Sequence, residues 1–506
     1  FALLGLLGWM LGAVAPATGQ TYDYWNQWYR FDQNYIKLLV EEDGLYRVTA
    51  SDLQAAGADI SSLVPENVQV FYRGQEIRLR MVSNGGNFDY FEFLGQRNDG
   101  HLDSLIYRKP STPFGYDPSQ QPNRLYSFFS DTSAYFVTWD ATATQRTEQI
   151  QPTNYAARSP EPWYQYRTGY IWENQHFKGG GSITSSNHAL NPDYITGEGF
   201  IGPIFNPNSA INTAARTIPT PGYANSGSPV RLETRVLHTN SATPPVLGSE
   251  VNNKALYRAT TFGINIATRD VSFNLNMSTV TQVRYRAFGQ GSLIDYGSPI
   301  WFHLYYDRNF DLEEASSTII RNWARSDSTY MQFLNADVTS EAWLVDRVSG
   351  KTISATVTGD TLHFLVPGYP GERDLHVYTD QAVRTPIIDP VPSLANLSDI
   401  NSGAEFVIIT HRIFANSAQA YANYRDTSSV NRLSSKVVFI DQIIDEFGYG
   451  SLTPWAIKNF CKYALDNWVV KPRFFMLWGK GRSSPKTEKS ANYIPCFGAP
   501  VNDYEY

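Results

Sequence analysis

The hydrophobic pattern of this chain changes once, and that change limits the possible folds more than any other feature. From about residue 22 to residue 389, short alternations of apolar and polar residues are separated by turn residues, as in strands with one buried face. After a proline-marked segment at 385–392, continuous apolar runs alternate with helical stripes, which is typical of an α/β unit with a parallel sheet. The sequence therefore predicts a multidomain protein with a β-rich, sandwich-like or barrel-like N-terminal region before that α/β unit.

The amino-acid composition agrees with a largely β-structured protein. Tyr, Phe and Trp make up 14% of the 506 residues, and aromatic side chains favour strands. Charged residues make up only 18%, whereas about 25% is typical. The length suggests about three domains, at roughly 150 residues each. Because the formal net charge is −7, the chain lacks the basic surface of a nucleic-acid-binding protein, and we expect no nucleic-acid partner.

Two hairpins are predicted near the start of the β-rich region. Ile36–Val40 and Leu45–Val48 flank an Asp-Gly pair, and Val68–Tyr72 and Ile77–Met81 flank an Arg-Gly pair. Glycine in such pairs favours a tight turn. Phe88–Phe93 alternates like a half-buried strand. Further strands are predicted at Arg231–His238, Val271–Met277, Gln282–Phe288, Trp301–Tyr306, Glu341–Val348 and Leu362–Val366.

Turn-rich segments suggest where the chain divides. Residues 187–228 are rich in Asn, Thr, Gly and Pro, and we interpret them as a long surface loop or as the junction between two units of a β-rich region at 20–385. Residues 386–402 are interpreted as a linker, followed by the first part of an incomplete α/β unit at 403–506. A linker there predicts that the β-rich region is a separable folding unit, which proteases would release by cutting between 385 and 402.

Three strands and two helices are predicted after the linker. The strands are Glu405–Thr410, Lys436–Asp441 and Arg473–Trp478. The second helix is predicted to begin after Thr453, which would cap it, with Pro454 at its first position. The buried faces are predicted to contain Phe414, Ala418, Tyr421 and Ala422 in the first helix, and Ile457, Phe460, Cys461, Ala464, Leu465 and Trp468 in the second.

Residues 1–19 have the features of a signal peptide. The first 15 residues carry no charge, and Ala15 and Ala17 supply the small residues of a cleavage site. This apolar run is shorter than the ~20 residues that a membrane-spanning helix needs. The alternative is a buried core helix, which the interruptions by glycine and proline disfavour. We therefore expect an exported protein that is soluble or peripherally attached.

No cofactor or metal pattern is present in the sequence. Gly479–Gly481 follows a predicted strand but lacks the spacing of a phosphate-binding loop. Asp307–Asp311 has the first ligand spacing of an EF-hand, but Leu312 and Thr318 stand where that loop needs Gly and Glu. The eight histidines include no His-x-x-x-His pair. We therefore expect neither a cofactor nor a metal ion.

The two cysteines differ in their predicted surroundings. Cys461 lies on the apolar face of a helix, which favours a packing role, whereas Cys496 lies on a loop after the third strand. His411 ends the first strand at the carboxyl edge of the sheet, where α/β proteins bind their ligands. A His411–Cys496 nucleophile–base pair is one hypothesis. The alternative, which we favour, is that His411 caps the end of the strand through a hydrogen bond.

Segments at both ends of the chain carry a resemblance to known proteins. The N-terminal segments are Glu42–Val48, Asp89–Phe93 and Asn98–Gly100. The C-terminal segments are Phe406–His411, Asp445–Gly450, Thr453–Pro454, Ala456–Phe460, Asn467–Trp468, Lys471–Arg473 and Leu477–Gly479. With these segments, the C-terminal end resembles the start of the gingipain-type cysteine peptidase domain, and the N-terminal end resembles the β-rich leader of PorU-type sortases of the type IX secretion system.

The resemblance implies a caspase-like α/β domain with a His–Cys dyad. In the family the dyad follows the matched region, so the catalytic residues are expected beyond Tyr506 and neither cysteine of this chain inherits the nucleophile role. Asp503 resembles the family aspartate that helps to form the substrate pocket. Lys480 is a departure, because the family often has an acidic residue after the third strand.

Two classes of function follow from these observations. The first is an exported cysteine peptidase or transpeptidase that trims the C-terminal sorting domains of proteins secreted by the type IX system and joins those proteins to a surface anchor. Its partners would be those secreted proteins and outer-membrane subunits of the secretion system, and its location the periplasm, outer membrane or cell surface. The alternative is a non-catalytic surface module whose β-domains bind glycan or partner proteins.

Overall fold

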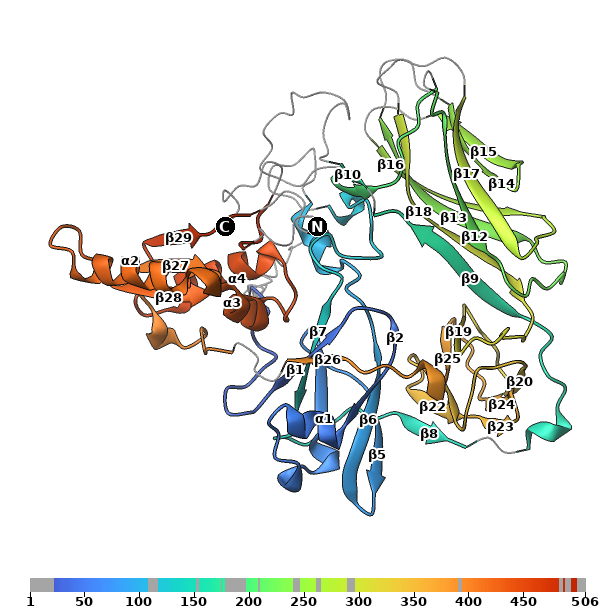
Figure 1. Ribbon diagram of the computed structural model, residues 1–506, viewed down its shortest axis with the longest axis horizontal. Helices are drawn as coiled ribbons and strands as arrows, with labels where there is room; N and C mark the ends of the chain where they lie inside the picture. Colours follow the sequence, from blue (N-terminus) through green and yellow to red (C-terminus); the bar gives the residue numbers. More distant parts are fainter. Residues whose placement is uncertain are drawn as a thin grey trace, which may run out of the picture.

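Three β-rich units and one α/β unit make up the computed structural model (Figure 1). The structure describes residues 22–107, 117–151, 154–173, 175–177, 197–207, 210–239, 246–260, 265–288, 296–389, 394–481, 486 and 493–497. The predicted signal peptide at 1–19 lies outside the described residues. The predicted fold class is confirmed: β-sheets dominate the chain up to residue 389, and a parallel sheet with helices follows.

The N-terminal unit consists of two sheets around one core. Its sheets have the strand orders β26-β1-β7-β3-β4 and β2-β6-β5. Leu38, Val48 and Phe91, from three different strands, are completely buried between them. The elements are β1 (Ile36–Val40), β2 (Gly44–Thr49), α1 (Ala50–Ala55), β3 (Gln69–Tyr72), β4 (Gln75–Glu76), β5 (Arg80–Asn84), β6 (Asn87–Gly95), β7 (Ser133–Thr138) and β26 (Ile387–Asp389).

The first predicted hairpin is wrong and the second is partly wrong. Strand β1 pairs with β7 and β26, whereas β2 pairs with β6, so the turn between β1 and β2 connects two sheets. Both strands bury apolar side chains in the same core. A turn that connects the two sheets allows this, whereas a flat hairpin would place both strands in one sheet. The second turn does form, because Arg73 and Gly74 both have positive φ angles. The strand that follows this turn and pairs with β3 is the two-residue β4. Strand β5, which comes next, belongs to the other sheet.

The second unit is a sandwich of two four-stranded sheets, with the orders β12-β17-β14-β15 and β16-β13-β18-β9. Leu232 and Phe302 of one sheet meet Val283 and Tyr285 of the other in the core. The elements are β9 (Tyr164–Ile171), β12 (Thr213–Pro219), β13 (Val230–Thr239), β14 (Val246–Val251), β15 (Lys254–Thr260), β16 (Asn265–Phe273), β17 (Val280–Phe288) and β18 (Tyr296–Arg308), with the separate pair β10 (Gln175–Phe177) and β11 (Gly199–Ile201).

The segment at 187–228 is neither a plain loop nor a domain junction. Its described residues include β11 and β12, and β9 before it pairs with β18 after it. Chain on both sides of the segment therefore belongs to one sandwich. The strand predicted at Val271–Met277 is also shifted, because β16 ends at Phe273. Beyond that residue, Leu275 and Met277 contribute to the core from outside the sheet.

The third unit is a smaller pair of sheets, with the orders β19-β25-β21-β22-β8 and β20-β24-β23. The β-rich region thus contains three units with their own cores rather than the two predicted. The elements are β8 (Glu148–Ile150), β19 (Ser317–Ile320), β20 (Thr329–Phe333), β21 (Ala342–Asp346), β22 (Lys351–Ser354), β23 (Thr356–Thr358), β24 (Thr361–Val366) and β25 (Leu375–Thr379).

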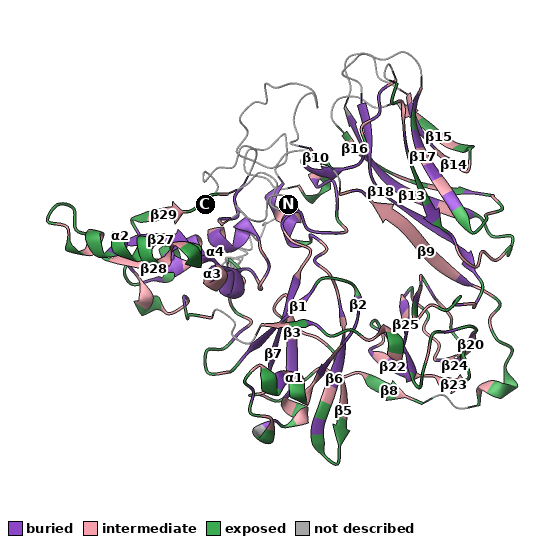
Figure 2. Cartoon of the chain, in the orientation of Figure 1, coloured by how far each residue is buried: buried purple, intermediate pink, exposed green. Residues whose placement is uncertain are grey.

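The α/β unit has a parallel three-stranded sheet in the order β28-β27-β29. Helix α2 covers one face, and α3 and α4 cover the other. Figure 2 shows that α3 and α4 are largely buried, whereas α2 exposes most of its surface. The elements are β27 (Phe406–Thr410), α2 (Ala415–Thr427), β28 (Ser435–Phe439), α3 (Ile440–Phe447), α4 (Pro454–Asn467) and β29 (Phe474–Trp478).

Two details of this unit differ from prediction. Ile440 and Asp441 belong to α3 rather than to the second strand, because the Gln442 side chain accepts a hydrogen bond from the Phe439 N–H and so starts a helix there. Leu465 is 47% exposed, since the last turn of α4 extends past the sheet that buries the other residues of its stripe. The cap of α4 is as predicted, with Thr453 accepting a hydrogen bond from the Trp455 N–H.

The predicted linker at 386–402 is partly structured, and both of its ends pack onto neighbouring units. Ile387–Asp389 forms β26 in the N-terminal sheet, and 390–393 lie outside the described residues. Beyond them, the Leu397 carbonyl accepts a hydrogen bond from the Trp468 side chain in the α/β core, at 2.9 Å. The N-terminal segment also reaches this unit, because Trp25 stacks on Tyr449 at 5.4 Å.

Candidate functional site at the carboxyl edge of the parallel sheet

The three parallel strands end at the same level. Thr410, the last residue of β27, is in register with Phe439 of β28 and Trp478 of β29. Its hydroxyl donates a hydrogen bond to the Trp478 carbonyl at 2.8 Å, which joins the ends of β27 and β29. In α/β folds, ligands bind beyond the carboxyl ends of the strands. The loops that follow these three residues therefore form the candidate site.

His411 follows β27 directly and is exposed to solvent. Its Nδ1 accepts a hydrogen bond from the Ile413 N–H at 3.2 Å, so His411 caps the short turn after the strand. This is the capping role favoured from the sequence. Because Nδ1 accepts, the neutral ring carries its proton on Nε2, which remains the nitrogen able to donate. The ring also lies against Tyr493, with the ring centres 5.3 Å apart.

Cys496 is buried, which does not suit a nucleophile. Its thiol donates a hydrogen bond to the Ile494 carbonyl at 3.2 Å and packs so closely on Gly481 that any side chain there would collide with the sulfur. The residue is only 8% exposed and belongs to the core between the sheet and α4. A catalytic thiol needs access to substrate and a base beside it. The partners of His411 and Cys496 therefore favour structural roles for both.

Cys461 packs in the core, as its place on the helical stripe predicts. It is 4% exposed, and burial raises the pKa of its thiol well above the usual value. A raised pKa leaves the sulfur protonated and unreactive.

An ion pair that sequence reasoning missed joins two strand ends. The Arg412 Nε donates to the Asp441 carboxylate at 2.5 Å, and the guanidinium lies 4.7 Å from the centre of the Phe439 ring. Arg412 stands two residues after the end of β27, and Asp441 two residues after the end of β28. Opposite charges at equivalent positions after adjacent parallel strands were the signal that could have revealed this pair.

The loop after β29 returns over the same edge. The Lys480 carbonyl accepts hydrogen bonds from the N–H groups of Tyr493 and Ile494, at 2.9 and 3.1 Å. Tyr493 is thereby held against His411 and also against Phe414, whose ring centre is 5.1 Å away. Asp503 and Tyr506 lie outside the described residues. The described part of the loop thus adds the Tyr493 ring to the edge at which His411 and the Arg412–Asp441 pair follow β27 and β28.

Lys486 anchors this loop on the β-rich region. Its side chain is 7% exposed, and its ammonium group pairs with Asp131 and, at 3.4 Å, with Glu173. The ammonium also lies 4.0 Å from the centre of the Tyr126 ring. Burial tends to raise the pKa of Asp131, but the hydrogen bond and charge of Lys486 lower it overall. Lys486 is therefore held by residues of the β-rich region.

The described residues offer no evident metal ligands. Within the ranges given above, no group of three His, Cys, Asp or Glu side chains is arranged to hold a metal ion. The helices among these residues are also too short or too polar to cross a membrane. The side chains at the candidate site supply a hydrogen-bond donor at His411, an aromatic surface at Tyr493, and a paired cation and anion at Arg412 and Asp441.

Residues 399–506 match the model of a known family, described as Peptidase family C25. This confirms the resemblance of the C-terminal part to gingipain-type peptidases. A search of curated proteins finds no matching sequence. Among solved structures, the chain is similar to dimeric latent PorU from Porphyromonas gingivalis, with a TM-score of 0.58 and 15% identity. The match covers 90% of this chain and 42% of the PorU chain, so the chain spans about two fifths of PorU and shares its fold over that part.

Two other matches are much weaker. A carbohydrate-binding module in complex with calcium and xylotriose has a TM-score of 0.18 and 11% identity, and the match covers 27% of this chain and 98% of the module. An insecticidal delta-endotoxin from Bacillus thuringiensis has a TM-score of 0.15 and 11% identity, covering 36% of this chain and 28% of the toxin. Neither match bears on function.

Proposed function

We propose that this chain is part of an exported, gingipain-like cysteine peptidase of the sortase type. Its substrates would be proteins carrying C-terminal sorting domains of the type IX secretion system, which it cleaves and transfers to a surface anchor. The observation that carries the proposal is the parallel sheet within 399–506, the segment that matches Peptidase family C25. The PorU-like fold over 90% of the chain supports the sortase type within that family.

The carboxyl edge of the sheet is the proposed substrate cleft. His411, Tyr493 and the Arg412–Asp441 pair would line it, and Asp503 would contact the substrate residue before the scissile bond. The catalytic histidine and cysteine would be residues other than His411 and Cys496, and the proposal expects them after Tyr506. Proposed partners are the secreted substrates and outer-membrane subunits of the secretion system, and the proposed location is the periplasm, outer membrane or cell surface.

The test compares two forms of the protein, the 506-residue chain and a form that continues past Tyr506. A cysteine-directed covalent inhibitor should label the longer form, which should also hydrolyse a peptide that spans a sorting-domain junction. In the longer form, Cys461→Ala and Cys496→Ala should leave labelling unchanged, because both thiols are buried. If the 506-residue chain hydrolyses peptides and Cys496→Ala abolishes that activity, the His411–Cys496 pair is catalytic and the proposed location of the dyad is wrong.

A further inference from the structure

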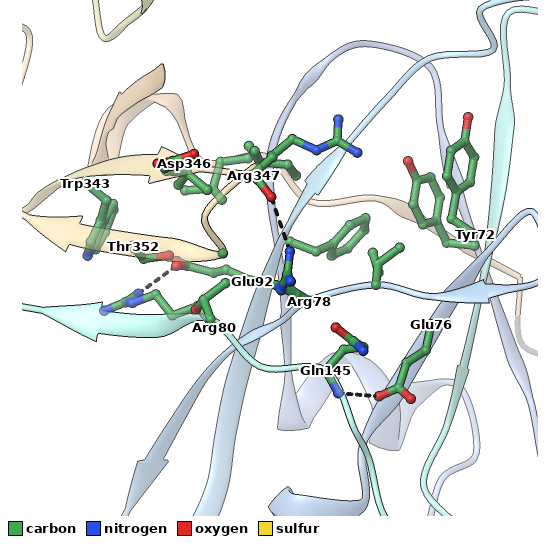
Figure 3. Close-up of a pocket in the computed structure, with 18 residues that line it drawn as sticks. Tyr72, Glu76, Arg78, Arg80, Glu92, Gln145, Trp343, Asp346, Arg347 and Thr352 are labelled. Atoms are coloured by element: carbon green, nitrogen blue, oxygen red, sulfur yellow. Dashed lines mark hydrogen bonds and ion pairs between the residues drawn. The ribbon is translucent and has the colours of Figure 1, made fainter. Parts of the chain in front are cut away.

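A pocket of about 300 Å³ lies between the N-terminal unit and the third β-unit. Figure 3 labels, among the residues that line it, Tyr72 and Arg78 of the N-terminal unit and Trp343 and Arg347 of the third unit. The volume is at the lower end of the range for small-molecule sites, roughly 300–1,000 Å³. Such sites often form where two domains meet, because each contributes one wall.

The carboxylates that line this pocket already have partners. Glu92 and Asp346 are each 1% exposed, so their charges would be costly without compensation. The partners are Arg47 and Arg80 for Glu92, Arg373 for Asp346, and Thr144 and Gln145 for Glu76. These acids are satisfied within the protein and would not attract a further cation.

Two arginines of the pocket have no such compensation among the residues that the structure describes. Arg78 donates a hydrogen bond to the carbonyl of Arg347 at 3.2 Å, and neither side chain forms an ion pair with another described residue. In Figure 3 the side chain of Arg347 extends toward the side of the pocket where Tyr72 lies. Burial raises the pKa of both Tyr72 and Tyr135, and the positive charge of Arg347 opposes this effect in each. Both tyrosines line the pocket together with Arg347.

The wall beside these cations is aromatic. The rings of Tyr72 and Tyr135 are stacked, with centres 4.5 Å apart and planes 10° apart, and Phe93 packs on Tyr135 at 5.0 Å. The opposite wall is shaped to admit Arg78: Gly350 has a φ of +73°, and a Cβ there would lie 2.7 Å from the Arg78 Nε. Only glycine combines this turn with the close approach of the guanidinium.

We propose that this pocket binds a carboxylate carried on an aromatic group. Arg78 and Arg347 would hold the carboxylate through charge-assisted hydrogen bonds, and the Tyr72–Tyr135–Phe93 wall would contact the ring. Such a ligand could be the C-terminal residue of a peptide or a small aromatic acid, since both present the same chemistry. The site is formed by the β-rich units alone and goes beyond the proposed peptidase function.

Calorimetric titration of the 506-residue protein tests this inference without requiring peptidase activity. The probes are N-acetylphenylalanine for a peptide terminus and phenylacetate for a small acid, each beside its neutral amide. At least one acid should bind about tenfold or more tightly than its amide, because hydrogen bonds to charged groups are the stronger ones. Arg347→Gln and Arg78→Gln should each weaken that binding about tenfold. Arg432→Gln, an exposed arginine on the α/β unit, is the matched control and should have no effect.

The binding results for the two acids, their amides and the variants distinguish the possible outcomes. Tighter binding of N-acetylphenylalanine assigns the site to peptide termini, and tighter binding of phenylacetate assigns it to small acids. Equal binding of acid and amide, or no binding of either acid, overturns the proposal. The proposal is also overturned if the Arg347→Gln variant binds the acid as tightly as the Arg432→Gln variant does. Melting temperatures of all three variants should equal that of the wild type, because each replaces an exposed side chain.

Discussion

His411 and Cys496 show how far chemistry could be inferred for single side chains. The position of His411 at the end of a strand predicted a capping role, and its side chain does accept a hydrogen bond from the Ile413 N–H in the turn that follows the strand. The loop position of Cys496 suggested accessibility, yet the thiol is buried, because the loop folds back on Lys480 and Gly481. That return involves contacts between distant residues, which local sequence patterns do not reveal.

Asp503 is the residue whose proposed role is most directly testable. In the form that continues past Tyr506, Asp503→Asn should lower kcat/KM about tenfold or more for substrates with a basic residue before the scissile bond, because a charge-assisted contact is lost. Stability should change by no more than ~0.5 kcal/mol, as for most surface substitutions. Rates are compared with those on a substrate with an uncharged residue at that position. Glu505→Gln is the control, and equal rates for Asp503→Asn and wild type on both substrates would remove Asp503 from the site.

Helix α2 packs on the sheet through two small residues. Ala418 is completely buried and Ala422 nearly so, and they let the helix approach Phe406 and Ile408 closely. Ala418→Leu should therefore destabilise the α/β unit by about 1–3 kcal/mol through overpacking. Ala420→Leu changes an exposed position of the same helix and should stay within ~0.5 kcal/mol. Urea denaturation monitors both, and equal midpoints for the two variants would contradict this packing.

Strands and helices could be predicted where buried residues recur at a regular spacing along the chain. Strand β1 was predicted to the residue, and the cap of α4 followed from Thr453 and Pro454, because these signals act within one turn of the chain. Errors arose where pairing is non-local. The sequence between β1 and β2 resembles a hairpin, but its strands find partners at β7, β26 and β6. The Arg412–Asp441 pair likewise needs the register of two parallel strands, which no local pattern supplies.

The N-terminal unit holds the α/β unit through buried polar contacts. Lys37 of β1 pairs with Asp445 at 3.0 Å, and the Tyr29 hydroxyl donates a hydrogen bond to Glu446 at 3.0 Å. Glu446 is completely buried and also accepts from the Leu397 N–H at 2.8 Å. These contacts connect the two regions that the predicted linker separates. The separable folding of the β-rich region, with cleavage between 385 and 402, therefore remains a prediction that proteolysis has to test.

Glu446 should make this connection sensitive to pH. Burial raises the pKa of its carboxyl from 4.5 to about 7, so the folded protein keeps a proton that the unfolded chain loses. The resulting stabilisation is complete below pH 4.5 and is lost as the pH rises through about 7. Between about pH 5 and pH 8, the loss in unfolding free energy should be of the order of 3 kcal/mol.

Melting temperatures across this pH range measure the effect. The Glu446→Gln variant should melt at nearly the same temperature at about pH 5 and at about pH 8, since an amide does not titrate. Glu341→Gln, an exposed acid on the third unit, should behave as the wild type. If the Glu446→Gln variant retains the full pH dependence of the melting temperature, that dependence arises from other groups.

Strand β26 has a consequence for the order in which this protein can fold. It begins at Ile387, yet its partner β1 begins at Ile36, and the strands of both the sandwich and the third unit lie between them in the chain. During synthesis, the edge of β1 that pairs with β26 therefore remains unpaired until both of those units have been synthesised. An unpaired edge is open to wrong partners, and non-local pairing is slow. We expect the two intervening units to fold first and the N-terminal sheet to close last, so a delay in either unit would prolong the time during which nascent chains can aggregate.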